Sequence, residues 1–398
     1  MLSAALVVSS GCRRDAALDA AARAELASVL AQRYIIVDGH IDVPIRHHND
    51  AVDLSVRIER GEFDWPRARQ GGLDAPFMSI FTPSSYQSEP EKSKNHALRL
   101  IAFVEEIAAA SPEKFVMAAS VADVRAAKET GRVGLLMGME NGAPIEGDLS
   151  NVDLFHSKGI GYITLTHSED NQICDSSYAT TQTWGGLSPF GREVVARMNE
   201  VGIVVDVSHI SDETFWDVME LSTAPVFASH SSARKFVPDF ERNMSDEMIK
   251  LLGEKNGVIM INFGSSFLDG EYRVASDGRR AKEREVADAS GFEPGDPQRR
   301  EAVRAWREEN PLSNVDVSVV ADHIDHVVAL AGIDHVGFGS DFDGVGDTLP
   351  VGLEDVSRYP NLIRLLLERG YTEADIEKFC SGNVLRVMSE VERIAAEG

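Results

Sequence analysis

Val37-Asp38-Gly39-His40-Ile41-Asp42 closes a short apolar run with a histidine and an aspartate two positions apart. Five further apolar runs end on a side chain that binds metals or titrates: GLLMGME (134–140) at Glu140, YITLTH (162–167) at His167, IVVDVSH (203–209) at His209, PVFASH (225–230) at His230 and VGFGSDFD (336–343) at Asp341. One such ending is routine. Six of them predict a ring of strands whose C-terminal ends meet around one metal site.

The spacing of the apolar runs predicts the fold. Candidate strands lie at 34–39, 76–81, 132–139, 161–166, 202–208, 225–229, 257–262 and 335–340. Each is a short, nearly continuous apolar run, as expected for a parallel strand covered on both faces. Helix signals fill the intervals, so we expect an α/β fold of the (β/α)8 TIM-barrel type. A doubly wound open sheet would normally carry a glycine-rich phosphate turn after its first strand, where this chain has His40-Ile41-Asp42.

The barrel is predicted to occupy residues 34–398, preceded by a peripheral helix at 15–33, which is rich in alanine. Residues 264–315 form a long charged insertion after strand 7, with a helical piece near 297–309. Two interpretations of the insertion stay open. It is either a lid over the barrel mouth or a solvated excursion without a part in catalysis. Helix ends are expected at Ser245, as an N-cap, and at Gly253, as a stop.

Residues 1–14 are set apart as a candidate leader. Ser9-Ser10-Gly11-Cys12 resembles a bacterial lipoprotein cleavage box with Cys12 as the lipidated residue, although no positive charge precedes the apolar run. A periplasmic or membrane-anchored lipoprotein and a cytoplasmic protein with an N-terminal extension are therefore both open. A homodimer is also open, because the sequence does not decide the oligomeric state.

The composition excludes some partners. The chain has 39 Lys and Arg against 64 Asp and Glu, a net charge of −25, and no basic stripe, so no nucleic-acid partner is expected. Its three cysteines form no C-x-x-C pair. No apolar run reaches the roughly 18 residues of a membrane span.

The strand-end residues are predicted to bind metal. His40 and Asp42 point the same way from one strand, which favours a Zn²⁺ site. Glu140 closes a buried strand, where a carboxylate is costly unless it is paired or metal-bound, and its two oxygens can bridge two cations. His209 and His230 close consecutive strands, and neutral imidazoles suit Zn²⁺.

Two further strand-end residues have other expected roles. Asp341 follows the last strand and could bind metal or move protons. His167 has no second ligand beside it, so polarising a substrate oxygen fits it better than binding metal.

Several motifs in the same order are similar to those of the membrane (renal) dipeptidases, peptidase family M19 of the amidohydrolase-like metal-dependent hydrolases. The resemblance covers about residues 34–390 and includes DGHID (38–42), GMENG (138–142), YITLTHSEDN (162–171), DVSHISDETFWDV (206–218) and VGFGSDFDG (336–344). It implies a zinc-dependent dipeptidase that cleaves the peptide bond with a hydroxide bridging two ions. Substrates with a D-residue at the C-terminal position are included in that expectation.

The resemblance also implies a role for each site residue. It implies two Zn²⁺ ions bridged by Glu140, one also held by His40 and Asp42 and the other by His209 and His230, with His167 on the substrate carbonyl oxygen, Arg242 on the substrate carboxylate and Asp341 as the proton shuttle. Gly264 stands where the family often has an aromatic residue, and the insertion at 264–315 is longer than usual. Both departures concern side-chain specificity.

Two other functions fit the sequence less well. Another binuclear amidohydrolase-like enzyme, such as a phosphotriesterase-like one, commonly has H-x-H on its first strand and a bridging modified lysine, but this chain has H-x-D and no lysine at the end of a central strand. A non-catalytic metal-binding lipoprotein would be expected to lack ligands, yet every expected position is filled.

Overall fold

Eight parallel strands close into a barrel in the computed structural model, which describes residues 20–50 and 52–398. The barrel strands are β1 (Ile36–Ile41), β2 (Leu73–Phe81), β4 (Val133–Glu140), β5 (Ile160–Thr164), β6 (Val204–Asp206), β7 (Phe227–Ser231), β8 (Val258–Ile261) and β9 (Val336–Phe338). Their order is β2-β1-β9-β8-β7-β6-β5-β4, and pairing of β2 with β4 closes the ring. Each strand overlaps one of the eight predicted strands, so the predicted barrel is confirmed and the open sheet is excluded.

A ninth strand, β3 (Phe115–Met117), was not predicted. It pairs with the first residues of β4, from Val133 onward, whereas β2 pairs with β4 from Leu136 onward. The strand therefore lies outside the closed ring as an extra edge.

Helices separate the strands. In chain order they are a helix at 20–33, α2 (Val43–His47), α3 (Trp65–Gly71), α4 (Lys92–Ala110), α5 (Val121–Glu129), α6 (Ser150–Ser157), α7 (Pro189–Val201), α8 (Asp212–Leu221), α9 (Asp246–Glu254), α10 (Ser265–Leu268), α11 (Gly270–Ala289), α12 (Pro297–Glu309), α13 (Val317–Ala331), α14 (Tyr359–Glu368), α15 (Glu373–Glu377) and α16 (Asn383–Glu397). Ser245 caps α9 as expected, but the helix continues past Gly253 to Glu254. Gly253 lies inside the helix. The C-cap is Lys255, and Asn256, with φ at 59°, is the first residue in the left-handed region.

The predicted leader at 1–14, including Cys12, and the first residues of the predicted helix at 15–33 lie outside the described residues. The described part of that helix spans 20–33. None of the helices in the described part of the chain combines the length and apolar character needed to cross a membrane.

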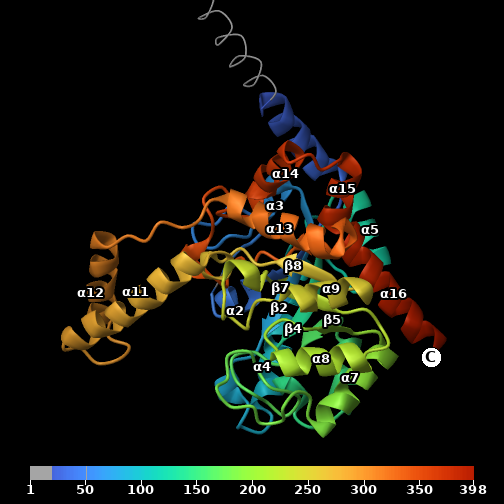
Figure 1. The fold of residues 1–398 in the computed structure, drawn as a ribbon, viewed down its shortest axis with the longest axis horizontal. Helices are drawn as coiled ribbons and strands as arrows, with labels where there is room; N and C mark the ends of the chain where they lie inside the picture. Colours follow the sequence, from blue (N-terminus) through green and yellow to red (C-terminus); the bar gives the residue numbers. More distant parts are fainter. Residues whose placement is uncertain (1–19, 51) are drawn as a thin grey trace, which may run out of the picture.

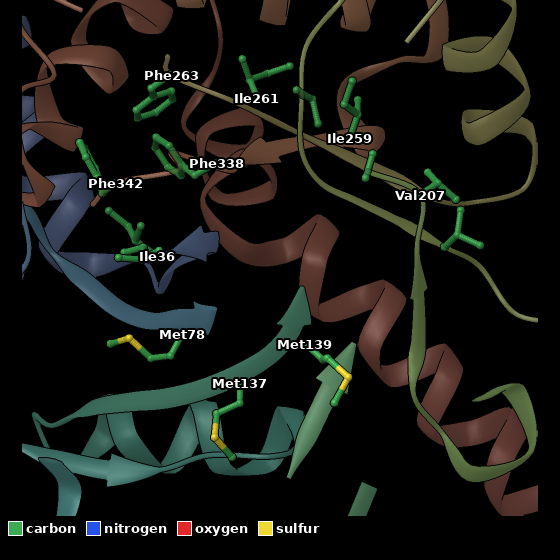
Figure 2. Close-up of a cluster of buried hydrophobic side chains, with 14 of the residues drawn as sticks. Ile36, Met78, Met137, Met139, Val207, Ile259, Ile261, Phe263, Phe338 and Phe342 are labelled. Carbon is green, nitrogen blue, oxygen red and sulfur yellow. The ribbon is translucent and has the colours of Figure 1, made fainter. Parts of the chain in front are cut away.

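Two buried clusters build the core. The larger one lies between the strands and the surrounding helices, and Figure 2 shows part of it, including Ile36, Met78 and Phe338. The smaller one fills the barrel with side chains from the first halves of the strands, such as Val37 and Val204, and it includes residues of α16. The N-terminal end of the barrel is therefore packed, and the C-terminal ends of the strands stay free for a site.

The insertion after the seventh barrel strand, β8, forms a helical hairpin. The helix expected near 297–309 is α12, and α11 precedes it. Glu283 of α11 joins the two helices through an ion pair with Arg307 of α12 at 2.7 Å, and Arg279, one turn away in α11, lies 3.1 Å from the same carboxylate. The hairpin projects away from the barrel in Figure 1, so most of it is no lid over the mouth. The base of the hairpin does not extend into solvent alone, because Arg273 and Arg280 of α11 line the cavity described below.

Gly138 in β4 allows the Tyr162 ring to pack inside the barrel, since a Cβ atom at Gly138 would lie 2.0 Å from Cζ of Tyr162. We expect Gly138→Ala to lower the free energy of unfolding by about 1–3 kcal/mol through overpacking. Gly278→Ala is the control, because its site in α11 is open and alanine should be neutral or stabilising there. Chemical denaturation of both variants checks this, and a Gly138→Ala protein as stable as the wild type would contradict it.

Candidate metal centre

The barrel brings the predicted metal-binding and proton-transfer residues together at the C-terminal ends of its strands. His40, Glu140 and His230 lie within β1, β4 and β7, and His167, His209 and Asp341 follow β5, β6 and β9. Their potential ligand atoms form three overlapping groups, in each of which the atoms lie within 4.8 Å of one another: His40, Glu140 and His230; Glu140, His167 and His209; and His40, Asp42 and Asp341. Two of the groups share Glu140, and two share His40.

Glu140 is the centre of this cluster. Its Oε1 lies 3.1 Å from Nε2 of His209, 3.4 Å from Nε2 of His167 and 3.5 Å from Nε2 of His230. Its Oε2 lies 3.4 Å from Nε2 of His40. Burial acts to raise the pKa of Glu140, but the histidines around it hold that pKa well below its usual range. The carboxylate is therefore an anion with imidazole nitrogens on both oxygens.

Two of the imidazoles, those of His209 and His230, offer lone pairs that suit a cation. Burial, aided by nearby positive groups, holds the pKa of His209 and of His230 well below the usual range, so both rings are neutral. Their Nε2 atoms lie 2.8 Å apart. Nε2 of His40 is buried and has no hydrogen-bond partner in the described structure. Such a set of imidazole and carboxylate donors fits a divalent transition metal such as Zn²⁺.

A contact on the Nδ1 side of the His40 ring, away from the cluster, fixes its orientation. Its Nδ1 lies 2.8 Å from the hydroxyl of Tyr162, and that hydroxyl donates to the carbonyl of Gly39 at 3.0 Å. Because the single hydroxyl proton goes to Gly39, the oxygen must accept the Nδ1 proton of His40. The Nε2 lone pair then faces the cluster, as a metal ligand requires.

His230 is oriented in the same manner. Ser229 donates its hydroxyl proton to Oδ2 of Asp206 at 2.7 Å, and its Oγ lies 2.7 Å from Nδ1 of His230. The serine therefore accepts the Nδ1 proton of His230 and leaves Nε2 toward the cluster. Neither Tyr162 nor Asp206 was predicted as a site residue. For Asp206, the sequence signal that could have indicated a role was an acid inside a mostly apolar strand, IVVDVS (203–208).

Asp341 has an environment suited to proton transfer. Burial, followed by the charge of Asp42, raises the pKa of Asp341 to about 8. Nδ2 of Asn262 donates to its Oδ2 at 2.7 Å and fixes the carboxyl group. Asp341 also has a left-handed backbone, with φ at 61°, which a non-glycine residue adopts only when its surroundings hold it there. A bound cation nearby would favour the anion, so the carboxyl group can both take and return a proton.

Arg242 contacts the end of β7 beside the cluster. Its guanidinium donates to Oγ of Ser231 at 2.8 Å and to the carbonyl of His230 at 2.7 Å. Its Nε is buried and has no partner in the described structure. Five N–H donors allow Arg242 to accept a further anion, although the side chain is not in the lining of the cavity.

A cavity of about 680 Å³ opens above the cluster. Asp42, Glu140, His167, His209 and Asp341 form its floor, and Phe81, Tyr178 and Phe267 supply aromatic walls. His167 is 23% exposed, more than the other histidines of the cluster, and its Nε2 faces Glu140. A small polar molecule in the cavity would therefore meet His167 and the candidate metal ligands at once.

Known proteins are similar to this chain in sequence and in fold. The sequence model of the membrane dipeptidases, peptidase family M19, matches residues 24–398. The dipeptidase aclJ of Aspergillus oryzae is 34% identical over 376 residues, which cover 91% of this chain and 79% of that protein.

Two crystal structures are similar over nearly their whole length. The probable dipeptidase PvdM from Pseudomonas aeruginosa is 29% identical with a TM-score of 0.79, covering 94% of this chain and 99% of that one. A metallo peptidase from Rhodobacter sphaeroides, liganded with a phosphinate mimic of the dipeptide L-Ala-D-Ala, is 27% identical with a TM-score of 0.73, covering 90% and 99%.

Tyr162→Phe should weaken metal binding, because Nδ1 of His40 loses the oxygen that fixes its tautomer. The expected loss of metal affinity is about 10- to 100-fold, measured by competition with a chelator of known affinity. Tyr371→Phe is the matched control, since its hydroxyl contacts Asp325 at 2.7 Å and no residue of the cluster. Equal affinities of the two variants would show that Tyr162 does not orient His40.

Proposed function

The chain belongs to the membrane dipeptidase family, peptidase family M19. We propose that the residues at the ends of its barrel strands carry out the metal-dependent hydrolysis of dipeptides. The observation that carries the proposal is the position of Glu140, a buried carboxylate with imidazole nitrogens against both of its oxygens. Four histidines surround this carboxylate, and packing of the barrel alone does not require them there.

Two Zn²⁺ ions are the proposed cofactor, with Glu140 between them. His40 and Asp42 would hold one ion, His209 and His230 would hold the other, and Glu140 would contribute to both. Nε2 of His40 lies 3.4 Å from Oε2 of Glu140, whereas Nε2 of His209 and Nε2 of His230 lie 3.1 and 3.5 Å from Oε1, which supports this division. When bound, such ions lower the pKa of water and polarise a carbonyl oxygen.

Three residues act on the substrate in the proposed mechanism. Asp341 takes the proton of the attacking water and gives it to the leaving amine, a role supported by its raised pKa. His167 donates a hydrogen bond to the carbonyl oxygen as negative charge develops on it, a role supported by its place on the cavity floor. Arg242 pairs with the C-terminal carboxylate and so limits the substrates to short peptides.

Dipeptides with a D-residue at the C-terminal position are included in the proposed substrates. The similar metallo peptidase from Rhodobacter sphaeroides holds a mimic of L-Ala-D-Ala, which supports this range. No observation in the described structure favours phosphotriesters or a non-catalytic role. Lipid attachment at Cys12 and a homodimer stay predictions from the sequence.

Asp341→Asn should keep both metal ions and lose activity, because asparagine has a similar shape but cannot accept the proton. The expected fall in kcat is about 10²- to 10⁴-fold, with metal content measured on the same sample. Loss of metal together with activity would instead make Asp341 primarily a ligand.

Arg242→Ala should weaken the binding of dipeptides far more than that of dipeptide amides, which lack the free carboxylate. Loss of a charge-assisted pair of about 1.5–3 kcal/mol corresponds to a rise in KM of about 10- to 100-fold for the free dipeptide. Each amide serves as the control for its own dipeptide, so disturbance of the metal ligands affects both alike. Equal losses on the two substrates would refute the carboxylate contact.

A further inference from the structure

The insertion after β8 contributes two arginines to the cavity. Arg273 and Arg280 both line it. They are seven residues apart in α11, so they lie two turns apart on one face of the helix. The carboxylates that line the cavity, including Glu140 and Asp341, belong to the barrel end. The cavity thus has an acidic floor and a wall with two guanidinium groups.

Arg273 is held in place without a close acidic partner. Its guanidinium carbon lies 3.4 Å from the centre of the Phe240 ring, a cation–π contact. Its ion pair with Asp277 is long, at 4.0 Å. Asp277 instead contacts Arg280 at 2.6 Å. Arg280 is half exposed and already paired, so Arg273 is the guanidinium that offers unused donors to a ligand in the cavity.

A pair of aromatic rings connects Arg273 to Arg242. The rings of Phe240 and Phe267 lie 5.7 Å apart. Arg273 stacks on Phe240, and the guanidinium of Arg242 lies 5.6 Å from the centre of the Phe267 ring. The two arginines therefore contact adjoining rings, of which Phe267 lines the cavity together with Arg273. A ligand group beside Arg242 has Arg273 as its neighbour.

We propose that Arg273 binds an acidic side chain on the C-terminal residue of the substrate, so that dipeptides ending in glutamate or aspartate are the preferred substrates. This inference rests on the proposed function, in which Arg242 holds the α-carboxylate of that residue. A C-terminal dicarboxylic residue places its second anion on the side of the cavity that carries Arg273.

Charge complementarity favours this class over others. The α-amino group of the substrate suits the acidic floor, where Asp42 and Asp341 lie. A basic side chain on the C-terminal residue would face two guanidinium groups, and an apolar one would leave the donors of Arg273 unused. In a chain with a net charge of −25, a guanidinium wall also attracts anions to a surface that otherwise repels them.

The test compares isosteric substrates on the metal-loaded, full-length protein. Values of kcat/KM are measured for Ala-Glu and Ala-Gln, each with an L- and a D-configured C-terminal residue, for the wild type, Arg273→Gln and Arg273→Lys. Arg284→Gln is the matched control, because Arg284 is an exposed residue of α11 outside the cavity lining.

The wild type should prefer Ala-Glu over Ala-Gln by about 10- to 100-fold, the range for one charge-assisted hydrogen-bonded pair. Arg273→Gln should abolish the preference while changing kcat/KM for Ala-Gln by less than about threefold. Arg273→Lys should restore part of the preference, because it restores the charge without the planar fork. Arg284→Gln should behave as the wild type.

Absence of a Glu preference in the wild type, or equal losses of Arg273→Gln on both substrates, would overturn the inference. The second result would assign Arg273 to the α-carboxylate instead. Calorimetric binding of phosphinate mimics of Ala-Glu and Ala-Gln to the same proteins separates this inference from the proposed function. If no dipeptide is cleaved, the proposed function fails, but a Glu preference in binding that disappears in Arg273→Gln still supports the role of Arg273, and equal binding still refutes it.

Discussion

The carboxylate of Glu140 lies buried at the end of β4, with imidazole nitrogens of four histidines within 3.5 Å of its oxygens. A buried carboxylate is costly unless positive or hydrogen-bonding groups surround it. The parallel barrel meets this need, because it places the ends of β1, β5, β6 and β7 around the end of β4. The imidazoles of His209 and His230 are neutral and do not balance the charge of the carboxylate, whereas cations held beside them would. The same geometry that closes the barrel therefore creates a metal site.

The layer behind the ligands explains how their geometry is kept. Tyr162 and Ser229 accept the Nδ1 protons of His40 and His230, and Asp206 accepts the proton of Ser229. Asp38 adds a further support, because its carboxylate accepts from the backbone N–H of His40 at 3.0 Å and from the hydroxyl of Tyr359 at 2.5 Å. Asp38 and Asp206 are not among the residues that line the cavity. They hold ligands in one tautomer, and their effect on catalysis is indirect.

The sequence was sufficient to predict the barrel and the residues around Glu140, since parallel strands read as apolar runs and their ends must meet at one face. It was not sufficient for Tyr162, whose role depends on contact with a residue more than one hundred positions earlier. The sequence analysis also did not predict α11. This helix contains few apolar residues, so its sequence resembles that of a charged, solvated loop. The place of Arg273 in the cavity follows from how α11 leaves the barrel, which no local pattern encodes.

The candidate metal centre and the wall that carries Arg273 are thus built from different parts of the molecule, the strand ends and the insertion. The central claim of the proposal concerns the strand ends: the residues around Glu140 would hold two cations in each chain. Elemental analysis of the full-length protein, loaded with Zn²⁺ and then dialysed against metal-free buffer, tests it most directly. Two tightly held ions per chain are predicted, and one ion or none would contradict the account.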